Sequence, residues 1–354
     1  MSVDSRAARP PGRLRPRSSP DGNSVVSFRN NRVRTRIVRR LIRSLDAAGV
    51  IGVFCLLMVL PSGVTRLAGS DTIETAGLRG TVSVLQIRGP SDRRPHPVWV
   101  WRPPGPDSAT IPVLYFLHGY PGSASDPFTA GLARTLNGLL QQGYPPFVFA
   151  SVDGNGEHHA DTEWANASDG SDQVMDRVVD AAIPAVEGTH MRDAAHRAIA
   201  GFSMGGYGAM NIAMQNPGVF GQVVSIAGYF VVNDLSGMFG DRPALVAKNA
   251  PSGHPWWLRG GSGGIRVLSP PGSAEQAQGM RVLLDEDGSD PSPLIRGQAA
   301  WMGGLLRRYG VPVTVHVQPG THDWAYTTSA LRYSFTFLAG NWRQAAANDE
   351  SGMP

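Results

Sequence analysis

The sequence predicts an α/β protein with a mostly parallel sheet and helices on both faces, preceded by one N-terminal membrane segment. Three observations support this prediction. Short apolar runs typical of buried strands alternate along the chain with segments of helical periodicity. A Gly-x-Ser-x-Gly sequence stands between one such strand and one such helix. Near the N-terminus, an uncharged apolar stretch follows a segment rich in arginine.

The composition fits one sizeable globular domain plus an extension, because 42% of the 354 residues are hydrophobic and 17% are charged. The formal net charge of +4 is unevenly distributed. Residues 1–43 hold twelve arginines and two aspartates, so they carry +10 and the rest of the chain sums to −6. We therefore expect residues 1–45, which are also proline-rich and lack periodicity, to be a disordered, basic cytoplasmic tail.

The uncharged apolar stretch runs from Ala47 to Val64. As a helix rising 1.5 Å per residue it would extend about 27 Å, close to the thickness of a hydrocarbon core. Because the arginines lie on its N-terminal side, the positive-inside rule keeps the tail in the cytoplasm and places the C-terminal domain outside. We predict a transmembrane signal anchor over residues 46–66, in a single-pass protein of the cell membrane.

Other interpretations of this N-terminal part stay open. A cleaved signal peptide is the alternative to an anchor, because Pro61 shortens the apolar run and Leu67-Ala68-Gly69 offers small residues for cleavage. The protein would then be secreted. A buried helix of the soluble core would leave the charge asymmetry unexplained. The arginine tail could bind nucleic acid, but the adjoining apolar stretch favours a membrane, so we expect no nucleic-acid partner.

The globular domain is expected over residues 71–345, and its strands and helices follow from apolar periodicity. A first pair of strands is predicted at Thr81–Ile87 and His96–Trp101, and the later strands at Ile111–Leu117, Phe147–Val152, Arg197–Ala200, Val223–Ile226, Arg281–Leu284 and Val313–Val317. Helices are predicted at Phe128–Gln142, Val174–Val186 and Met204–Gln215. Residues 229–280 are rich in Gly, Pro and Ser and are predicted to form a cap insertion over the site, with a plain surface excursion as the alternative.

Ser203 is the candidate nucleophile. A serine held on a sharp strand-to-helix turn leaves no room for side chains two residues before and after it, and Gly201 and Gly205 stand there. Gly206 adds clearance. In a chain this rich in glycine and serine the pattern would arise by chance about 0.4 times, so the rest of the chain has to support it.

A nucleophilic serine needs a base, and the base needs an orienting acid; in α/β-hydrolases these follow in the order serine, acid, histidine. We predict His322 as the base, because it lies in the loop after the strand that contains His316. The acid is expected at the end of the strand that starts at Arg281. Asp290 is the preferred candidate and Asp287 the reserve.

An oxyanion hole requires two backbone N–H groups that point at the developing charge. Met204, directly after the serine, is predicted to supply one of them. The loop after the strand ending at Leu117 is predicted to supply the other through Tyr120, because the following Pro121 has no N–H. His118 in the same loop is expected to be structural.

With these pieces in chain order, the sequence resembles the esterase family that includes esterase D, formylglutathione hydrolases, feruloyl esterases and the antigen 85 mycolyltransferases. The resemblance runs from about Val82 to Trp342 and lies in the segments His118-Gly119-Tyr120, Gly201–Gly206 and Gly320-Thr321-His322-Asp323-Trp324. It implies the α/β-hydrolase fold. It also implies that Ser203 is the nucleophile, that His322 is the base and that the Tyr120 and Met204 amides form the oxyanion hole. The resemblance supports Asp290 as the acid less directly, because Asp287 stands where the family has a glycine. Thr327 stands where a tryptophan is frequent.

The resemblance also bears on the substrate pocket. Thr162-Glu163-Trp164 resembles a stretch near the site in the antigen 85 proteins, and we expect Trp164 and Trp324 to contact the substrate.

Glu157-His158-His159 and Asp161 bring side chains that can bind a metal close together in sequence, but a catalytic triad needs no metal. We expect neither a metal nor a cofactor.

The sequence therefore predicts an extracytoplasmic serine esterase that hydrolyses carboxylic esters, including acyl lipids, through an acyl-enzyme on Ser203. An acyltransferase of the mycolyl- or diacylglycerol-forming kind would use the same triad, with a sugar or glycerol hydroxyl in place of water. A non-catalytic cell-envelope protein of the same fold is the third possibility.

Overall fold

A computed structural model of the protein describes residues 79–230, 236–240, 249, 280–292 and 294–351. The predicted tail 1–45, the predicted membrane segment 46–66 and most of the predicted insertion 229–280 lie outside the described residues. Among the helices in the described part of the chain, none combines the length and hydropathy that a membrane crossing requires. The described residues belong to one compact unit, Gly63–Pro354.

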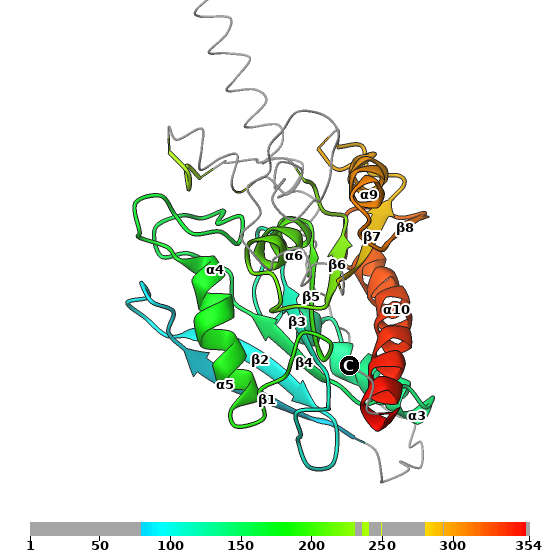
Figure 1. Ribbon diagram of the computed structural model, residues 1–354. Helices are drawn as coiled ribbons and strands as arrows, with labels where there is room; N and C mark the ends of the chain where they lie inside the picture. Colours follow the sequence, from blue (N-terminus) through cyan, green and yellow to red (C-terminus); the bar gives the residue numbers. More distant parts are fainter. Residues whose placement is uncertain (1–78, 231–235, 241–248, 250–279, 293, 352–354) are drawn as a thin grey trace, which may run out of the picture. The chain divides into compact units, whose positions relative to one another are not determined.

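An eight-stranded, mostly parallel sheet forms the centre of this unit (Figure 1), in the order β1-β2-β4-β3-β5-β6-β7-β8. Only the β1–β2 and β2–β4 pairings are antiparallel. The strands are β1 (Thr81–Ile87), β2 (His96–Arg102), β3 (Val113–Leu117), β4 (Val148–Val152), β5 (Arg197–Phe202), β6 (Gln222–Ile226), β7 (Arg281–Asp287) and β8 (Val313–Gln318). The mostly parallel sheet predicted from the alternating elements is confirmed.

The central strands β3, β4, β5 and β6 are buried along their whole length, as their continuous apolar runs predict. The edge strand β1 is instead exposed along most of its length, with Val82 and Val84 43% exposed and Ile87 buried at its end. The predicted strands are found at their expected places. The strand β7 is three residues longer than predicted, since it continues to Asp287.

The helices follow the strands in chain order. They are α2 (Asp126–Thr129), α3 (Leu132–Gln141), α4 (Val174–Asp176), the π-helical turn η1 (Arg177–Ala182), α5 (Ile183–Glu187), α6 (Met204–Gln215), α9 (Gln298–Arg308) and α10 (Trp324–Ser351). The last two were not predicted. The predicted helix 128–142 is broken at Gly131, which has a φ of 90°. In the predicted helix 174–186, Pro184 has no N–H to donate, and the turns before it are π-helical.

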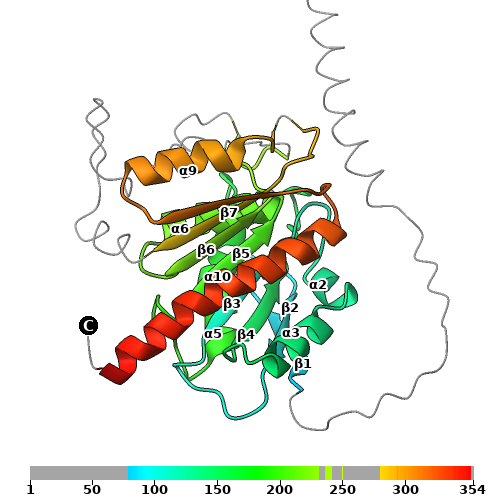
Figure 2. The ribbon, with the colours of Figure 1, turned by 90° about the vertical axis from the view of Figure 1, so that its right-hand side faces the viewer.

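Helices pack on both faces of the sheet (Figure 2). On one face, α4, α5, α6 and α9 share an apolar core with Val113, Tyr115 and Leu117 of β3. On the other face, the rings of Phe116 and Phe149 stack with centroids 5.7 Å apart. Because side chains alternate along β3, this strand contributes apolar residues to the core on each face of the sheet.

The long helix α10 covers the second face. Its Phe335 and Trp342 place their rings 5.5 and 5.1 Å from the ring of Phe147, which precedes β4. All three side chains are at most 3% exposed. Because α10 begins two residues after His322 and then runs along the sheet, this packing also fixes the end of the loop that carries His322.

Candidate active site

Ser203 lies on a sharp turn between β5 and α6. It has a φ of 56° and a ψ of −118°, a backbone conformation that residues with a side chain rarely adopt. Its N–H donates to the carbonyl of Ile226 at 2.9 Å, which ties the turn to the neighbouring strand. The turn therefore holds the serine hydroxyl at the carboxyl-terminal edge of the sheet, as the sequence predicts.

Glycines make this turn possible. A Cβ on Gly201 would lie 2.1 Å from the carbonyl oxygen of Gly205, and a Cβ on Gly205 would lie 2.0 Å from the carbonyl oxygen of Leu117. Both distances are far below van der Waals contact, and both partners are backbone atoms. The helix α6 can start directly after Ser203 only because these two positions carry no side chain.

His322 lies in the loop between β8 and α10, and its Nε2 is 2.8 Å from Ser203 Oγ. Its ring packs on that of Phe202 at a centroid distance of 4.6 Å, and the residue is only 9% exposed. Asp323 next to it accepts a hydrogen bond from the N–H of Tyr326 at 2.8 Å, which caps the start of α10. The loop is thereby held at the histidine's C-terminal side.

Two carboxylates face the other nitrogen of His322. Asp287 Oδ2 lies 3.2 Å from Nδ1 with hydrogen-bond geometry, and Asp290 Oδ2 lies 3.0 Å from the same atom. Both residues are buried. The N–H of Asp290 donates to the carbonyl of Asp287, so a tight turn at the end of β7 brings the two carboxylates together. The preferred acid and its reserve thus both contact the histidine.

The electrostatics of these three groups are linked. Burial raises the pKa of Asp287, and the neighbouring Asp290 charge adds to this, so that the pKa stays above its usual value despite His322. Burial also acts to raise the pKa of Asp290, but the nearby His322 and the hydrogen bond from the N–H of Ser292 lower it below its usual value. Burial alone would lower the pKa of His322, whereas the two carboxylates raise it above 6.5.

The loop after β3 lies against the serine. A Cβ on Gly119 would be 3.2 Å from the Cβ of Ser203, so the backbone of Gly119, the residue directly before Tyr120, borders the turn. Met204, at the first position of α6, borders it from the helix side. The amides of Tyr120 and Met204, the two predicted oxyanion donors, therefore belong to segments that meet at Ser203.

His118 has the structural role that the sequence predicts. Its Nε2 accepts a hydrogen bond from the N–H of Gly154 at 2.9 Å, so its Nδ1 carries the proton and donates to the carbonyl of Gly119 at 2.8 Å. Both ring nitrogens are occupied by backbone partners. The histidine connects the loops after β3 and β4, and it is 1% exposed.

Trp164 does not reach the site surface, contrary to the expectation that it contacts the substrate. It is completely buried, and its indole N–H donates to the carbonyl of His118 at 3.0 Å. Its side chain fills the space beside Gly154 and Gly208: a Cβ on Gly154 would lie 2.4 Å from the indole ring, and a Cβ on Gly208 would lie 2.4 Å from the Cβ of Trp164. Through this hydrogen bond and its packing, the side chain stabilises the loop after β3. Trp324 is half-buried and lies 6.3 Å from the ring of Phe202, beside His322.

The ligand-capable run at residues 157–161 does not assemble as one cluster. Glu157 lies near Asp92 and His96, while His159 bonds Asp172 at 2.9 Å. Both oxygens of Asp92 accept hydrogen bonds from Arg177, at 2.7 and 2.6 Å. Glu157 Oε1 accepts hydrogen bonds from the backbone N–H groups of Arg93 and Arg94. Protein partners thus occupy both carboxylates of this group, while the buried His96 Nε2 has no hydrogen-bond partner among the described residues. In the described part of the chain, Asp287, Asp290 and His322 form the other such cluster, and this one adjoins Ser203.

The sequence gives no specific indication that Asp285, near the end of β7, is also buried. Asp285 is 1% exposed and accepts hydrogen bonds from His316, Gln318 and the Tyr326 hydroxyl. The only available signal was the acidic run at residues 285–287, which reads equally well as a solvated turn. Its partners come from β8 and α10, so the contact depends on the fold.

Comparison with known proteins identifies a matching family and several solved structures with a similar fold. The family model "Esterase", described as "Putative esterase", matches residues 92–338, which is more than half of the chain. A ferulic acid esterase superposes with a TM-score of 0.59 at 20% identity, over 74% of this chain and 98% of its own. An S-formylglutathione hydrolase from Agrobacterium tumefaciens gives 0.57 at 17% identity, over 74% and 96%. MPT51 from Mycobacterium tuberculosis gives 0.54 at 18% identity, over 74% and 98%. At these identities the structural matches show a shared fold.

Proposed function

This chain belongs to the esterase family and is a carboxylic ester hydrolase, and we propose that it works through an acyl-enzyme formed on Ser203. The observation that carries the proposal is the 2.8 Å contact between Ser203 Oγ and His322 Nε2, with two carboxylates at His322 Nδ1. A serine with a base in reach, and a base held by an acid, is the arrangement that nucleophilic catalysis requires.

The first half of the reaction follows from these contacts. Ser203 Oγ attacks the ester carbonyl carbon, and its proton moves to His322 Nε2. The carbonyl oxygen becomes an oxyanion, which the N–H groups of Met204 and Tyr120 stabilise. The tetrahedral intermediate then breaks its bond to the alcohol oxygen. The departing alcohol takes the proton from His322, and the acyl group stays on Ser203.

Water completes the cycle. It attacks the acyl carbon while His322 Nε2 accepts its proton, and the same two amides hold the oxyanion. Collapse releases the carboxylic acid, and Ser203 Oγ regains its proton from His322. A sugar or glycerol hydroxyl in place of water would give acyl transfer. We assign hydrolysis as the principal reaction, because the matching family is one of esterases.

The rate should fall on the acid side as His322 becomes protonated, because only the neutral imidazole accepts the serine proton. The pKa of His322 is raised by Asp287 and Asp290. The acid limb of kcat/KM for p-nitrophenyl acetate should therefore have its midpoint above pH 6.5. With Asp287→Asn and Asp290→Asn combined, the residual activity should show a midpoint at lower pH. A wild-type midpoint at or below pH 6.5 would contradict this electrostatic account.

We further propose that the esterase domain lies outside the cytoplasm, held at the membrane by residues 46–66. The apolar stretch and the +10 charge before it support this orientation. Alkaline phosphatase, which is active only after export, should be active when fused to the C-terminus of the full chain. The same fusion lacking residues 46–66 should be inactive. An inactive full-length fusion, together with an active full-length β-galactosidase fusion, would refute the orientation.

A further inference from the structure

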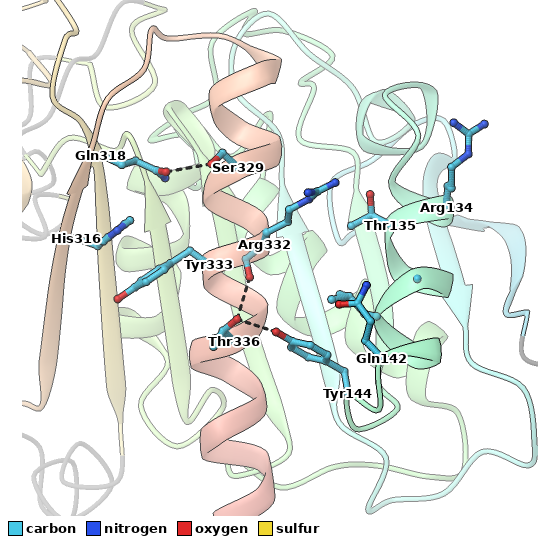
Figure 3. Close-up of a pocket in the computed structure, with 12 residues that line it drawn as sticks. Arg134, Thr135, Gln142, Tyr144, His316, Gln318, Ser329, Arg332, Tyr333 and Thr336 are labelled. Atoms are coloured by element: carbon cyan, nitrogen blue, oxygen red, sulfur yellow. Dashed lines mark hydrogen bonds between the residues drawn. The ribbon is translucent and has the colours of Figure 1, made fainter.

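A trough away from Ser203 crosses the outer surface of the domain (Figure 3). It is floored by α10 and flanked by α3 on one side and by β8 on the other, and its volume is about 630 Å³. That volume lies within the range of small-molecule sites in proteins. The polar residues that line it are Arg134, Thr135, Gln142, Tyr144, His316, Gln318, Ser329, Arg332, Tyr333 and Thr336.

The trough is positively charged. Among the described residues that line it, two are arginines and none is acidic. In Figure 3, Arg332 reaches from α10 toward α3, which carries Arg134. Neither guanidinium forms an ion pair with a carboxylate in the described part of the chain. The chain outside residues 1–43 sums to −6, so two uncompensated guanidinium groups in one hollow are a local exception.

A buried carboxylate fixes part of the lining. Asp285, which the reaction does not use, accepts from His316 Nδ1 at 2.6 Å and from Gln318 Nε2 at 3.0 Å. The Nδ1 proton of His316 is therefore engaged in the hydrogen bond to Asp285, and Nε2 is the ring nitrogen that can bond a ligand. The imidazole also stacks on Tyr333 at 3.8 Å. Two polar groups of the trough are therefore held in place before any ligand arrives.

Hydrogen bonds order the floor as well. Ser329 Oγ donates to Gln318 Oε1 at 3.1 Å, which links the floor to the β8 wall. The hydroxyls of Tyr144 and Thr336 bond each other at 2.9 Å, which links the floor to the segment after α3. The trough thus offers two guanidinium groups together with hydroxyl, amide and imidazole groups. Guanidinium groups recognise phosphate and carboxylate oxygens, and the neutral groups suit the hydroxyls of a sugar.

We propose that this trough binds an anionic sugar of hexose size, such as a sugar phosphate, at a site separate from the ester-hydrolysing centre. The guanidinium groups of Arg134 and Arg332 hold the anionic group. The ring hydroxyls bond His316, Gln318 and the hydroxyl-bearing side chains. The inference does not depend on the proposed esterase mechanism, because none of its residues contacts Ser203 or His322.

Isothermal titration of the full-length protein with glucose 6-phosphate, glucose and inorganic phosphate tests the proposal. We expect glucose 6-phosphate to bind at least about tenfold more tightly than either of the others, since it alone engages both kinds of groups. The substitutions Arg332→Gln and Arg134→Gln should each weaken its binding about tenfold. The matched control Arg308→Gln, at the end of α9 and outside the trough, should bind as the wild type does.

Three outcomes would overturn the proposal. They are absence of glucose 6-phosphate binding by the folded wild type, equal loss in the Arg308→Gln control, and binding of inorganic phosphate as tight as that of glucose 6-phosphate. All variants should keep wild-type hydrolysis of p-nitrophenyl acetate, which also reports that each is folded. Should an arginine variant lose that activity, His316→Gln provides a second test, with the same expected weakening.

Discussion

Replacement of Ser203 by alanine should lower kcat/KM for p-nitrophenyl acetate at least about 10⁴-fold, the scale on which loss of a serine nucleophile acts in other hydrolases. Alanine removes the attacking oxygen and leaves His322 Nε2 without the hydroxyl donor that lies 2.8 Å from it. The buried turn and both proposed oxyanion donors remain. We therefore expect the loss to appear in kcat and not in thermal stability.

A matched control separates the loss of this hydroxyl from the loss of any buried serine hydroxyl. Ser334 is completely buried in α10, where its hydroxyl bonds the carbonyl of Ala330 at 2.7 Å. Ser334→Ala should keep its activity within a few-fold of the wild type. Near-wild-type hydrolysis by a folded Ser203→Ala protein would refute the nucleophile assignment.

The second large effect is expected from the two carboxylates together. Replacing both Asp287 and Asp290 by asparagine should lower kcat about 10³- to 10⁴-fold, because no anion then orients His322 or stabilises its protonated form. Each single replacement should cost less, about 10- to 100-fold, because the remaining carboxylate still lies within 3.2 Å of Nδ1. The effects of the two substitutions are thus coupled and do not add independently.

The measurement is the steady-state kinetics of the wild type, the two single variants and the double variant. Asp323→Asn serves as the control. Asp323 neighbours His322 in sequence but caps α10, so its replacement should have little effect on kcat. If one single variant is as inactive as the double variant, that residue alone is the acid and the shared role is wrong. The pKa directions make Asp290 the carboxylate that stays ionised more readily, so its loss should be the greater of the two.

The sequence predicts the parts of this molecule whose constraints are local. The strands at the centre of the sheet are continuous apolar runs, and burial on both faces requires such runs. The turn at Ser203 is equally local, because the clashes that exclude side chains at Gly201 and Gly205 arise within a few residues or with the adjacent strand. The loop position of His322 follows from the end of β8.

Features that depend on tertiary contacts were harder to predict. The strand β7 continues into its acidic run, since pairing with β8 extends to Asp287, so two carboxylates instead of one face His322. Trp164 is turned inward by a backbone with positive φ at Glu163 and Trp164, a conformation for which non-glycine residues give no sequence signal. In α9, the adjacent Gly303 and Gly304 are weak helix formers, and packing on β7 and β8 stabilises the helix.

The central claim, that an acyl-enzyme forms on Ser203, is tested most directly by mass spectrometry of the full-length protein after reaction with a fluorophosphonate. The account predicts one adduct per chain, on the peptide that contains Ser203, and its absence in Ser203→Ala. Prior incubation with p-nitrophenyl acetate should slow its formation. No adduct on the folded wild-type protein, or an adduct on another residue that persists in Ser203→Ala, would contradict the claim.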